Sequence, residues 1–81
     1  MDYRQLQAFT VLAEELHFGR AAQRLHITQP ALTQQIKSFE NALELRLFTR
    51  DRRNVALTAE GQFLLAEARM ILGHCDKFRE N

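Results

Sequence analysis

The sequence has very few of the residues that interrupt helices or cross-link chains. Its 81 residues include one Cys, one Pro, three Gly and no Trp. Because a lone Cys75 cannot form an internal disulfide, the composition gives no sign of an oxidising compartment. No run approaches the roughly 18 uninterrupted apolar residues of a membrane span, and the N-terminus lacks the order of a signal peptide. We therefore expect a cytoplasmic chain that makes no membrane contact.

The composition is that of one small globular domain with an uneven charge distribution. With 46% hydrophobic and 26% charged residues, the chain is too apolar to be disordered and too short for two cores. The ends are mildly acidic, whereas residues 20–58 carry seven basic against three acidic side chains, a net charge of +4. An anionic partner is therefore expected to dock on this central segment.

Helical periodicity covers most of the first half of the chain. The spacing of apolar residues from Leu6 to Leu16 predicts a helix over about residues 2–15. A second, short helix is predicted over residues 20–25, with Gly19 as its N-cap.

A third helix is predicted to begin at Gln29 and to extend to residue 44. Thr28 is a good N-cap, and Pro30 suits a first helical turn because its missing N–H has no partner there. The apolar stripe of this helix consists of Leu32, Ile36, Phe39 and Leu43. Only three residues separate it from the second helix, which is the length of a helix-turn-helix connection, and Ile27 is expected to point into the core between them.

After residue 45 the pattern changes to two short β-suited runs, residues 47–49 and 55–57. The five residues between them include three arginines, with Asp51 and Asn54 as turn formers. A basic hairpin beside a helix-turn-helix is typical of a DNA-binding wing. We therefore predict a mainly α fold, a winged helix-turn-helix of three helices and a two-stranded wing over residues 1–58.

A final helix over residues 59–81, capped by Thr58, is more apolar than a lone surface helix would be. One stripe of it is expected to cover the core of the domain and another to face a second subunit, so that it serves as a linker and dimerisation helix. The alternative is that the whole helix packs inside one monomer. The predicted dimer-interface residues are Leu64, Leu65, Ala68, Ile71, Leu72 and Cys75.

The exposed face of the third helix offers the chemistry that reads base edges in a major groove. Gln pairs with adenine through two hydrogen bonds, and Thr and Pro contact a thymine methyl group. The predicted base-contacting residues are Gln29, Pro30, Thr33 and Gln34. The predicted phosphate contacts are Lys37, Arg20 and, on the wing, Arg50, with Arg52 and Arg53 at the minor groove. The alternative is that these polar side chains are merely solvated. For Arg24 two alternatives are open, a pair with Glu40 or contact with water alone.

The sequence gives little support for an enzyme or a metal-binding protein. The three His residues are scattered, Ser38 is the only Ser, and there is no Gly-rich phosphate loop. The neighbours His74 and Cys75 point about 100° apart on a helix and have no second pair of ligands. We therefore predict no catalytic residues, no metal site and no cofactor.

Several motifs resemble the N-terminal DNA-binding domain of LysR-type bacterial transcriptional regulators. They are residues 18–25 (FGRAAQRL), residues 28–33 (TQPALT), Leu47-Phe48 and residues 57–61 (LTAEG). The resemblance implies that Thr28 contacts the DNA backbone and that linker helices pair antiparallel in a homodimer. It also implies a C-terminal effector domain beyond this chain, where a small-molecule effector binds, and a full-length protein that is a dimer or a tetramer.

This chain departs from the family pattern at three positions. Thr33 stands where Ser is common, Gln34 where Arg is common, and Glu44 where a helix-ending Gly is usual. The loss of Arg at a base-facing position predicts a preference for a base other than guanine, and Glu44 is expected to alter how the third helix ends.

The sequence therefore predicts a bacterial, nucleoid-associated domain that binds an interrupted inverted repeat in double-stranded DNA as a dimer. The alternative is a winged-helix module that dimerises or docks a protein partner without nucleic acid.

Overall fold

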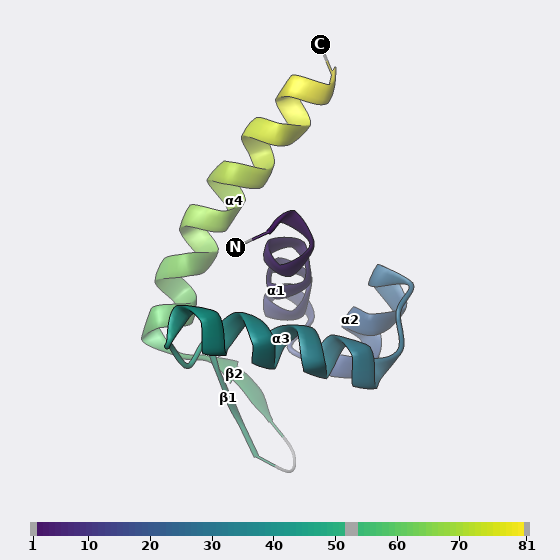
Figure 1. Cartoon of the computed structure of the whole chain (residues 1–81), viewed down its shortest axis with the longest axis vertical. Coiled ribbons are helices and arrows are strands. Elements are labelled where there is room, and N and C mark those ends of the chain that lie inside the picture. Colours follow the sequence, from purple (N-terminus) through teal and green to yellow (C-terminus); the bar gives the residue numbers. More distant parts are fainter. Residues whose placement is uncertain (1, 52–53, 81) are drawn as a thin grey trace.

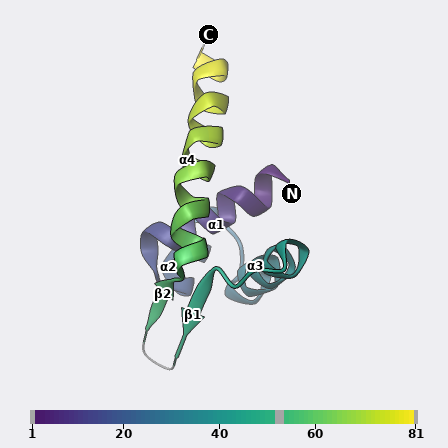
Figure 2. The ribbon, with the colours of Figure 1, turned by 90° about the vertical axis from the view of Figure 1, so that its left-hand side faces the viewer.

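The described part of the chain folds into four helices and one two-stranded hairpin. The computed structural model describes residues 2–51 and 54–80, and the side chains of those up to residue 73. The elements are α1 (Tyr3–Glu15), α2 (Phe18–Leu25), α3 (Gln29–Leu43), β1 (Phe48–Arg50), β2 (Val55–Leu57) and α4 (Ala59–Glu80). The first three helices pack around a core, the hairpin extends from one side, and α4 projects away on the other (Figure 1, Figure 2). This arrangement confirms the predicted winged helix-turn-helix followed by a long helix.

Side-chain caps fix where three of these helices begin. The Asp2 carboxylate accepts the N–H of Gln5 at 2.9 Å and so caps α1. At α3 the Thr28 hydroxyl accepts the N–H of Ala31 at 3.2 Å, with Pro30 in the first turn. The α4 cap is Thr58, as predicted, and its hydroxyl accepts the N–H of Gly61 at 2.9 Å. Each cap satisfies an N–H that has no partner within the helix, which is why these starts follow from sequence.

The start of α2 differs from the sequence-based prediction. The helix begins at Phe18, and its N-cap is His17, whose ring Nδ1 accepts the N–H of Arg20 at 3.0 Å. Gly19 was expected to be the cap but lies within the first turn. An imidazole nitrogen performs here the role that a Ser or Asp oxygen usually has.

Three helices end on a non-Gly residue in the left-handed conformation. Leu16, His26 and Glu44 have φ angles of 49°, 57° and 56°. Leu16 was expected on the buried stripe of α1, but it is exposed because the chain has already left the helix there. Glu44 does not change where α3 ends: its N–H donates to the Asn41 carbonyl at 3.2 Å, the bond that a Gly would make at this position.

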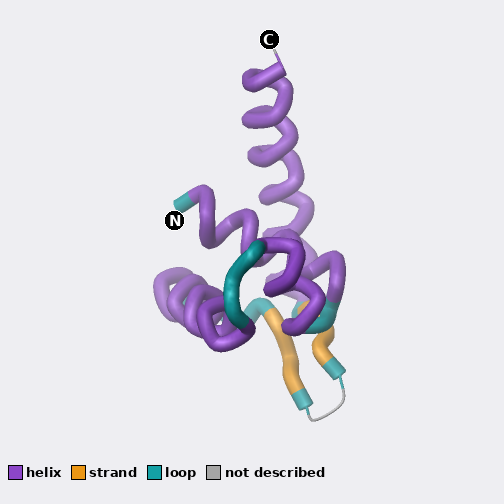
Figure 3. The backbone as a smooth tube through the Cα atoms, turned by 90° about the vertical axis from the view of Figure 1, so that its right-hand side faces the viewer, coloured by secondary structure: helices purple, strands orange, loops and turns teal. Residues whose placement is uncertain are grey.

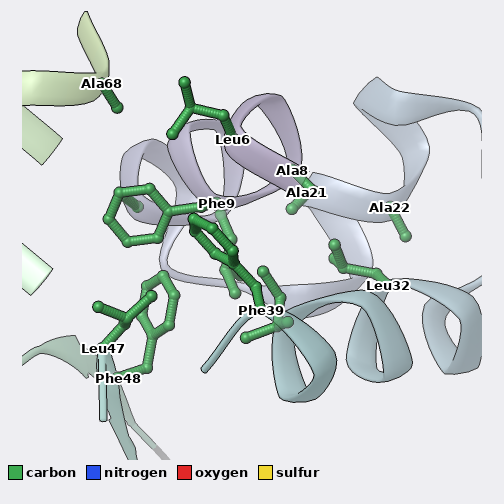
Figure 4. Close-up of a cluster of buried hydrophobic side chains, with 13 residues drawn as sticks. Leu6, Ala8, Phe9, Ala21, Ala22, Leu32, Phe39, Leu47, Phe48 and Ala68 are labelled. Atoms are coloured by element: carbon green, nitrogen blue, oxygen red, sulfur yellow. The ribbon is translucent and has the colours of Figure 1, made fainter. Parts of the chain in front are cut away.

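The core is built around three phenylalanines from three different elements. Phe9 of α1 packs against Phe39 of α3 and Phe48 of β1, with ring centroids 6.0 and 5.6 Å apart (Figure 4). Burying a side chain of this size contributes about 1.5–3 kcal/mol. Ile27 packs against this core as predicted, so the core joins the helix-turn-helix to the hairpin.

The two short strands of the hairpin lie side by side (Figure 3). They are antiparallel, with Phe48 opposite Leu57 and Arg50 opposite Val55. The first strand begins one residue later than predicted because the N–H of Leu47 donates to the Glu40 carboxylate at 2.8 Å and not to the opposite strand.

The first turns of α4 belong to the same core as the winged domain. Gly61 is buried against the backbone of Leu47, and Ala68 is fully buried in the cluster that contains Phe9. The predicted boundary between residues 58 and 59 therefore separates two elements that share one core. None of the helices in the described ranges is long and apolar enough to cross a membrane.

Candidate nucleic-acid interface

The first two turns of α3 lie at the surface. Gln29, Pro30 and Gln34 are exposed, and Thr33 is half-buried on the flank of the helix. The buried side of the same turns is formed by Leu32 and, one turn later, Ile36. An exposed helix end of this kind has the size and shape that a DNA major groove admits. The four predicted base-contacting residues are thus accessible together.

Lys37 extends this accessible face by one turn. It is exposed, three residues after Gln34, so the two side chains are neighbours on the helix surface. At the beginning of α3 the Thr28 oxygen accepts a backbone N–H, and its own O–H proton remains available as a donor to a phosphate. The predicted backbone contacts therefore flank the predicted base contacts.

The arginines of α2 make ion pairs with the end of α1. Arg20 Nε lies 3.2 Å from Glu15 Oε1, while Arg24 Nη1 lies 2.9 Å from Glu14 Oε1 and 3.0 Å from Glu15 Oε2. The suggested pairing of Arg24 with Glu40 is therefore wrong. The hydrogen bonds that Arg24 and then Arg20 donate lower the pKa of Glu15. The carboxylates of Glu14 and then Glu15, which accept from Arg24, raise the pKa of Arg24.

Arg20 remains a predicted phosphate contact, although it is already engaged. Its side chain is more than half exposed. Even so, its Nε donates to the Glu15 carboxylate, and its Nη2 donates to the Glu15 carbonyl at 3.4 Å. A DNA phosphate would have to compete with that carboxylate.

The wing arginines fall into two groups. Arg50 is described, and its guanidinium lies 4.8 Å from the centre of the Phe18 ring and 3.7 Å from Glu40 Oε1. Arg52 and Arg53, the predicted minor-groove contacts, lie outside the described residues.

An open hollow of about 510 Å³ separates α3 from the hairpin. Both signs of charge line it, because the lining includes the cations Lys37 and Arg46 and the carboxylates Glu40 and Glu44. Sequence analysis did not single out Arg46. Its position between the predicted recognition helix and the wing adds an exposed cation to this surface.

The predicted dimer interface on α4 needs a correction. Ala68 is fully buried within the chain, so its side chain offers no surface to a second subunit. Leu64, Leu65 and Leu72 are partly buried and pack on the same core. Ile71 is exposed as expected, and the side chain of Cys75 lies outside the described residues.

Among the side chains of α4 up to residue 73, the two most exposed large apolar ones lie outside the predicted interface. Phe63 is 72% exposed and Met70 is 60% exposed. They are seven residues apart, which places them on the same face of the helix. Phe63 lies about 140° from Ala68 around the helix axis. Beside Phe63 lies an apolar groove of about 420 Å³, lined by Leu43, Leu45, Ala59, Glu60, Phe63 and Leu64.

Comparison with known proteins gives close relatives over almost the whole chain. A family model described as bacterial regulatory helix-turn-helix protein, lysR family, matches residues 3–62. The HTH-type transcriptional regulator AlsR of Bacillus subtilis (strain 168) is 51% identical over 72 residues, which are 89% of this chain and 24% of that protein. The regulator YnfL of Escherichia coli (strain K12) is 50% identical over 76 residues, or 94% of this chain and 26% of that protein. The chain thus spans about a quarter of the length of these curated relatives.

Solved structures of similar shape include domains bound to DNA. The crystal structure of the BenM DBD with catB site 1 DNA matches with a TM-score of 0.94 at 36% identity, covering 99% of this chain and 89% of that chain. The complex of the CbnR DBD with DNA matches with a TM-score of 0.92 at 38% identity, covering 99% and 92%. The fold described above is therefore shared with domains that have been solved on DNA.

Proposed function

The chain belongs to the LysR family of bacterial regulatory helix-turn-helix proteins, and from that membership we propose that it binds double-stranded DNA sequence-specifically as part of a transcriptional regulator. Its action is recognition, not catalysis, and it takes place in the bacterial cytoplasm. Helix α3 enters the major groove, and the hairpin reaches the adjacent minor groove.

The observation that carries this proposal is the accessible end of α3 in a fold shared with DNA complexes. Gln29, Pro30 and Gln34 are exposed together at that end, and Lys37 follows one turn behind. The amide groups supply two hydrogen bonds in the geometry that suits adenine, whereas the ammonium group of Lys37 suits a phosphate. Sequence preference therefore comes from Gln34 and its neighbours, and general affinity from Lys37.

The regulator acts as a homodimer through α4. Phe63 and Met70 form the most exposed apolar surface of the described chain, on the side of α4 that turns away from Ala68. Large exposed apolar side chains that share one face of a helix are typical of a protein interface. We define these two residues as the α4 seam. Pairing of two seams gives the complex two recognition helices, which matches an inverted repeat in DNA.

A selection experiment tests the proposal directly. The purified chain is incubated with a random duplex library at low salt, and the retained DNA is sequenced. We expect enrichment of an inverted repeat, because two identical α3 helices related by a twofold axis read two identical half-sites.

Two other outcomes have distinct meanings. Retention without enrichment would indicate binding dominated by phosphate contacts, for which log K falls steeply with log salt but no base is preferred. A chain that retains no DNA even at low salt would contradict the proposal and favour a protein-interaction module. The enriched duplex, once known, is the probe for all further measurements.

A further inference from the structure

One carboxylate of α3 holds the beginning of the hairpin. The Oε2 atom of Glu40 accepts the N–H of Leu47 at 2.8 Å and the N–H of Phe48 at 3.3 Å. The Glu40 side chain is only 15% exposed. Leu47 precedes the strand ladder, which begins with Phe48 opposite Leu57, so Glu40 takes the place of a strand partner for this N–H.

The other oxygen of the same carboxylate faces a side chain of the hairpin. Glu40 Oε1 lies 3.7 Å from Arg50 Nη2, and the Arg50 guanidinium also lies over the ring of Phe18, 4.8 Å from its centre. Phe18 is the first residue of α2. Arg50 therefore leaves the end of β1 and contacts both helices of the helix-turn-helix. A planar guanidinium suits this position because it can pair with a carboxylate and stack on an aromatic face at once.

We propose that Glu40, Arg50 and Phe18 form a strut that sets the position of the hairpin relative to α3. Glu40 and Arg50 are then positioning residues for DNA recognition, and Arg50 is assigned this role in place of the phosphate contact that its position on the wing suggested. The inference rests on the proposed DNA binding and deepens it. The strut fixes how far the wing stands from the major groove that α3 reads.

The rest of the fold holds the hairpin at its base and through β2, whose Val55 and Leu57 pack against the core, and the strut adds contacts on the β1 side. The hairpin is anchored at its base, where Phe48 is buried in the core and the carbonyl of Leu47 accepts the N–H of Thr58. Beyond that base the strands are only three residues long, and an open hollow lies between them and α3. The described contacts that cross from the hairpin to the helices on that side are those of Glu40 and Arg50.

The strut matters for recognition because the two DNA-reading elements enter neighbouring grooves. A wing reads the width and potential of the minor groove, which depend on sequence, only if its tip is held at a fixed place. A hairpin that swings about its base would still contribute charge but would distinguish groove shapes poorly. Loss of the strut should therefore reduce shape discrimination at the wing and leave base discrimination by α3 intact.

The test uses the 81-residue chain and two duplexes built on the selected repeat. They share the half-sites and differ only in the outer segment that faces the wing, which is A·T-rich in one and G·C-rich in the other. The variants are Glu40→Gln, Arg50→Gln and the double variant, with Glu44→Gln as the matched control because Glu44 lines the same hollow one turn later. Affinities are measured for both duplexes and for a third with one half-site base changed.

We expect each single variant to lose about three- to tenfold of the preference between the two outer segments, and the double variant to lose no more than either. The preference for the correct half-site base should stay as in the unmodified chain. Glu44→Gln should change neither this preference nor the preference between the two outer segments. A merely structural loss would lower every affinity in proportion, so the ratio between duplexes separates the two. Unchanged preference between the outer segments in Glu40→Gln would overturn the strut.

A direct phosphate contact by Arg50 would give a different pattern. Arg50→Gln would then reduce the slope of log K against log salt by about one and would add to Glu40→Gln. That result would return Arg50 to the phosphate contacts and overturn its assignment here.

A second measurement does not depend on DNA. Amide hydrogen exchange in the free chain should become faster at Leu47 and Phe48 in Glu40→Ala, while exchange within α1 stays slow. Unchanged exchange at both amides would overturn the strut even if DNA binding is confirmed. Faster exchange with no DNA binding in any variant would mean that the strut exists and that the proposed function is wrong.

Discussion

Two glycines of α4 lie in opposite surroundings, and only one of them has a reason to be Gly. A Cβ on Gly61 would collide with the carbonyl oxygen of Leu47 and come within 2.8 Å of Leu57 Cδ2, whereas a Cβ on Gly73 would meet nothing within 4 Å. Gly61 therefore allows α4 to pack against the residue that leads into the hairpin. Gly73 only adds conformational freedom to the unfolded chain.

We predict that Gly61→Ala lowers the free energy of unfolding by about 1–3 kcal/mol, because a backbone carbonyl cannot move aside as a flexible side chain could. The matched Gly73→Ala variant should raise it by about 0.5–1 kcal/mol, the helix propensity gain of Ala over Gly. Urea unfolding followed by circular dichroism at 222 nm measures both. Similar effects at the two positions would show that close packing at Gly61 is not what selects Gly there.

The exposed residues of α3 divide into those that read bases and those that bind phosphate. Gln34→Ala should change the preference at one base position of each half-site by about 1–3 kcal/mol and leave other positions alone. Lys37→Ala should weaken binding to all duplexes alike and lower the salt slope by about one. Competition binding with single-base variants of the selected duplex checks both. If Gln34→Ala keeps the original base preference, this residue is not a reader.

At the scale of the elements, α3 ends on Glu44, whose own backbone conformation is strained. Its φ of 56° lies in the left-handed region that L residues other than Gly, Asn and Asp rarely occupy. Glu44→Gly should therefore stabilise the chain, by about 1 kcal/mol. Glu44→Ala is the control, because it removes the charge and keeps the strained backbone; thermal unfolding compares the two. A stabilisation of equal size in both variants would assign the effect to charge instead.

The junction of α1 and α2 should make stability depend on acidic pH. Arg24, and then Arg20, lower the pKa of Glu15 from its ordinary value of 4.5. A carboxylate with a lowered pKa in the folded state stabilises it above the unfolded value, and this contribution is lost as the pH falls through the folded value. The stability difference between the unmodified chain and Glu15→Gln should thus be constant above about pH 5 and shrink below it. Glu67→Gln serves as the control, and a difference independent of pH from 3 to 7 would contradict the prediction.

The elements that could be predicted from sequence are those with local signals. Thr28 and Thr58 cap helices through bonds to residues three positions later, and the periodic spacing of Leu32, Ile36 and Phe39 marks one buried face. The start of α2 could not be predicted, because a His ring is a rare cap and its tautomer and orientation depend on the fold.

At the scale of the whole molecule, contacts between distant elements escaped prediction. Glu40 lies only 40° from Ile36 around the α3 axis, so a charge on the edge of a buried stripe was a signal that some partner exists. Its partners Leu47, Phe48 and Arg50 belong to the hairpin, and periodicity within α3 cannot identify them.

The same limit applies to α4, where apolar residues cover nearly the whole circumference. Sequence suggested one stripe for the core and one for a partner, but only packing against α1 shows that Ala68 belongs to the first and Phe63 does not.

The seam on α4 yields the prediction that joins folding to recognition. Phe63→Asp should leave the fold intact, because the ring it removes is 72% exposed and lies outside the core. It should weaken dimerisation by about 2 kcal/mol or more, since the partner's apolar seam would then face a charge. Sedimentation equilibrium measures this, with Gln62→Asp as the control that adds the same charge at the neighbouring exposed position.

DNA binding then distinguishes the seam from any other surface. A dimer gains affinity on an inverted repeat because binding of one half-site holds the second α3 helix near the other. Phe63→Asp should therefore lose affinity for the full repeat by about 10²-fold or more and keep its affinity for a single half-site unchanged. If Phe63→Asp remains a dimer with full affinity for the repeat, another face of the chain holds the two α3 helices together. Ile71→Asp is then the next variant, because Ile71 lies about 80° further around α4 and tests the other side of that helix.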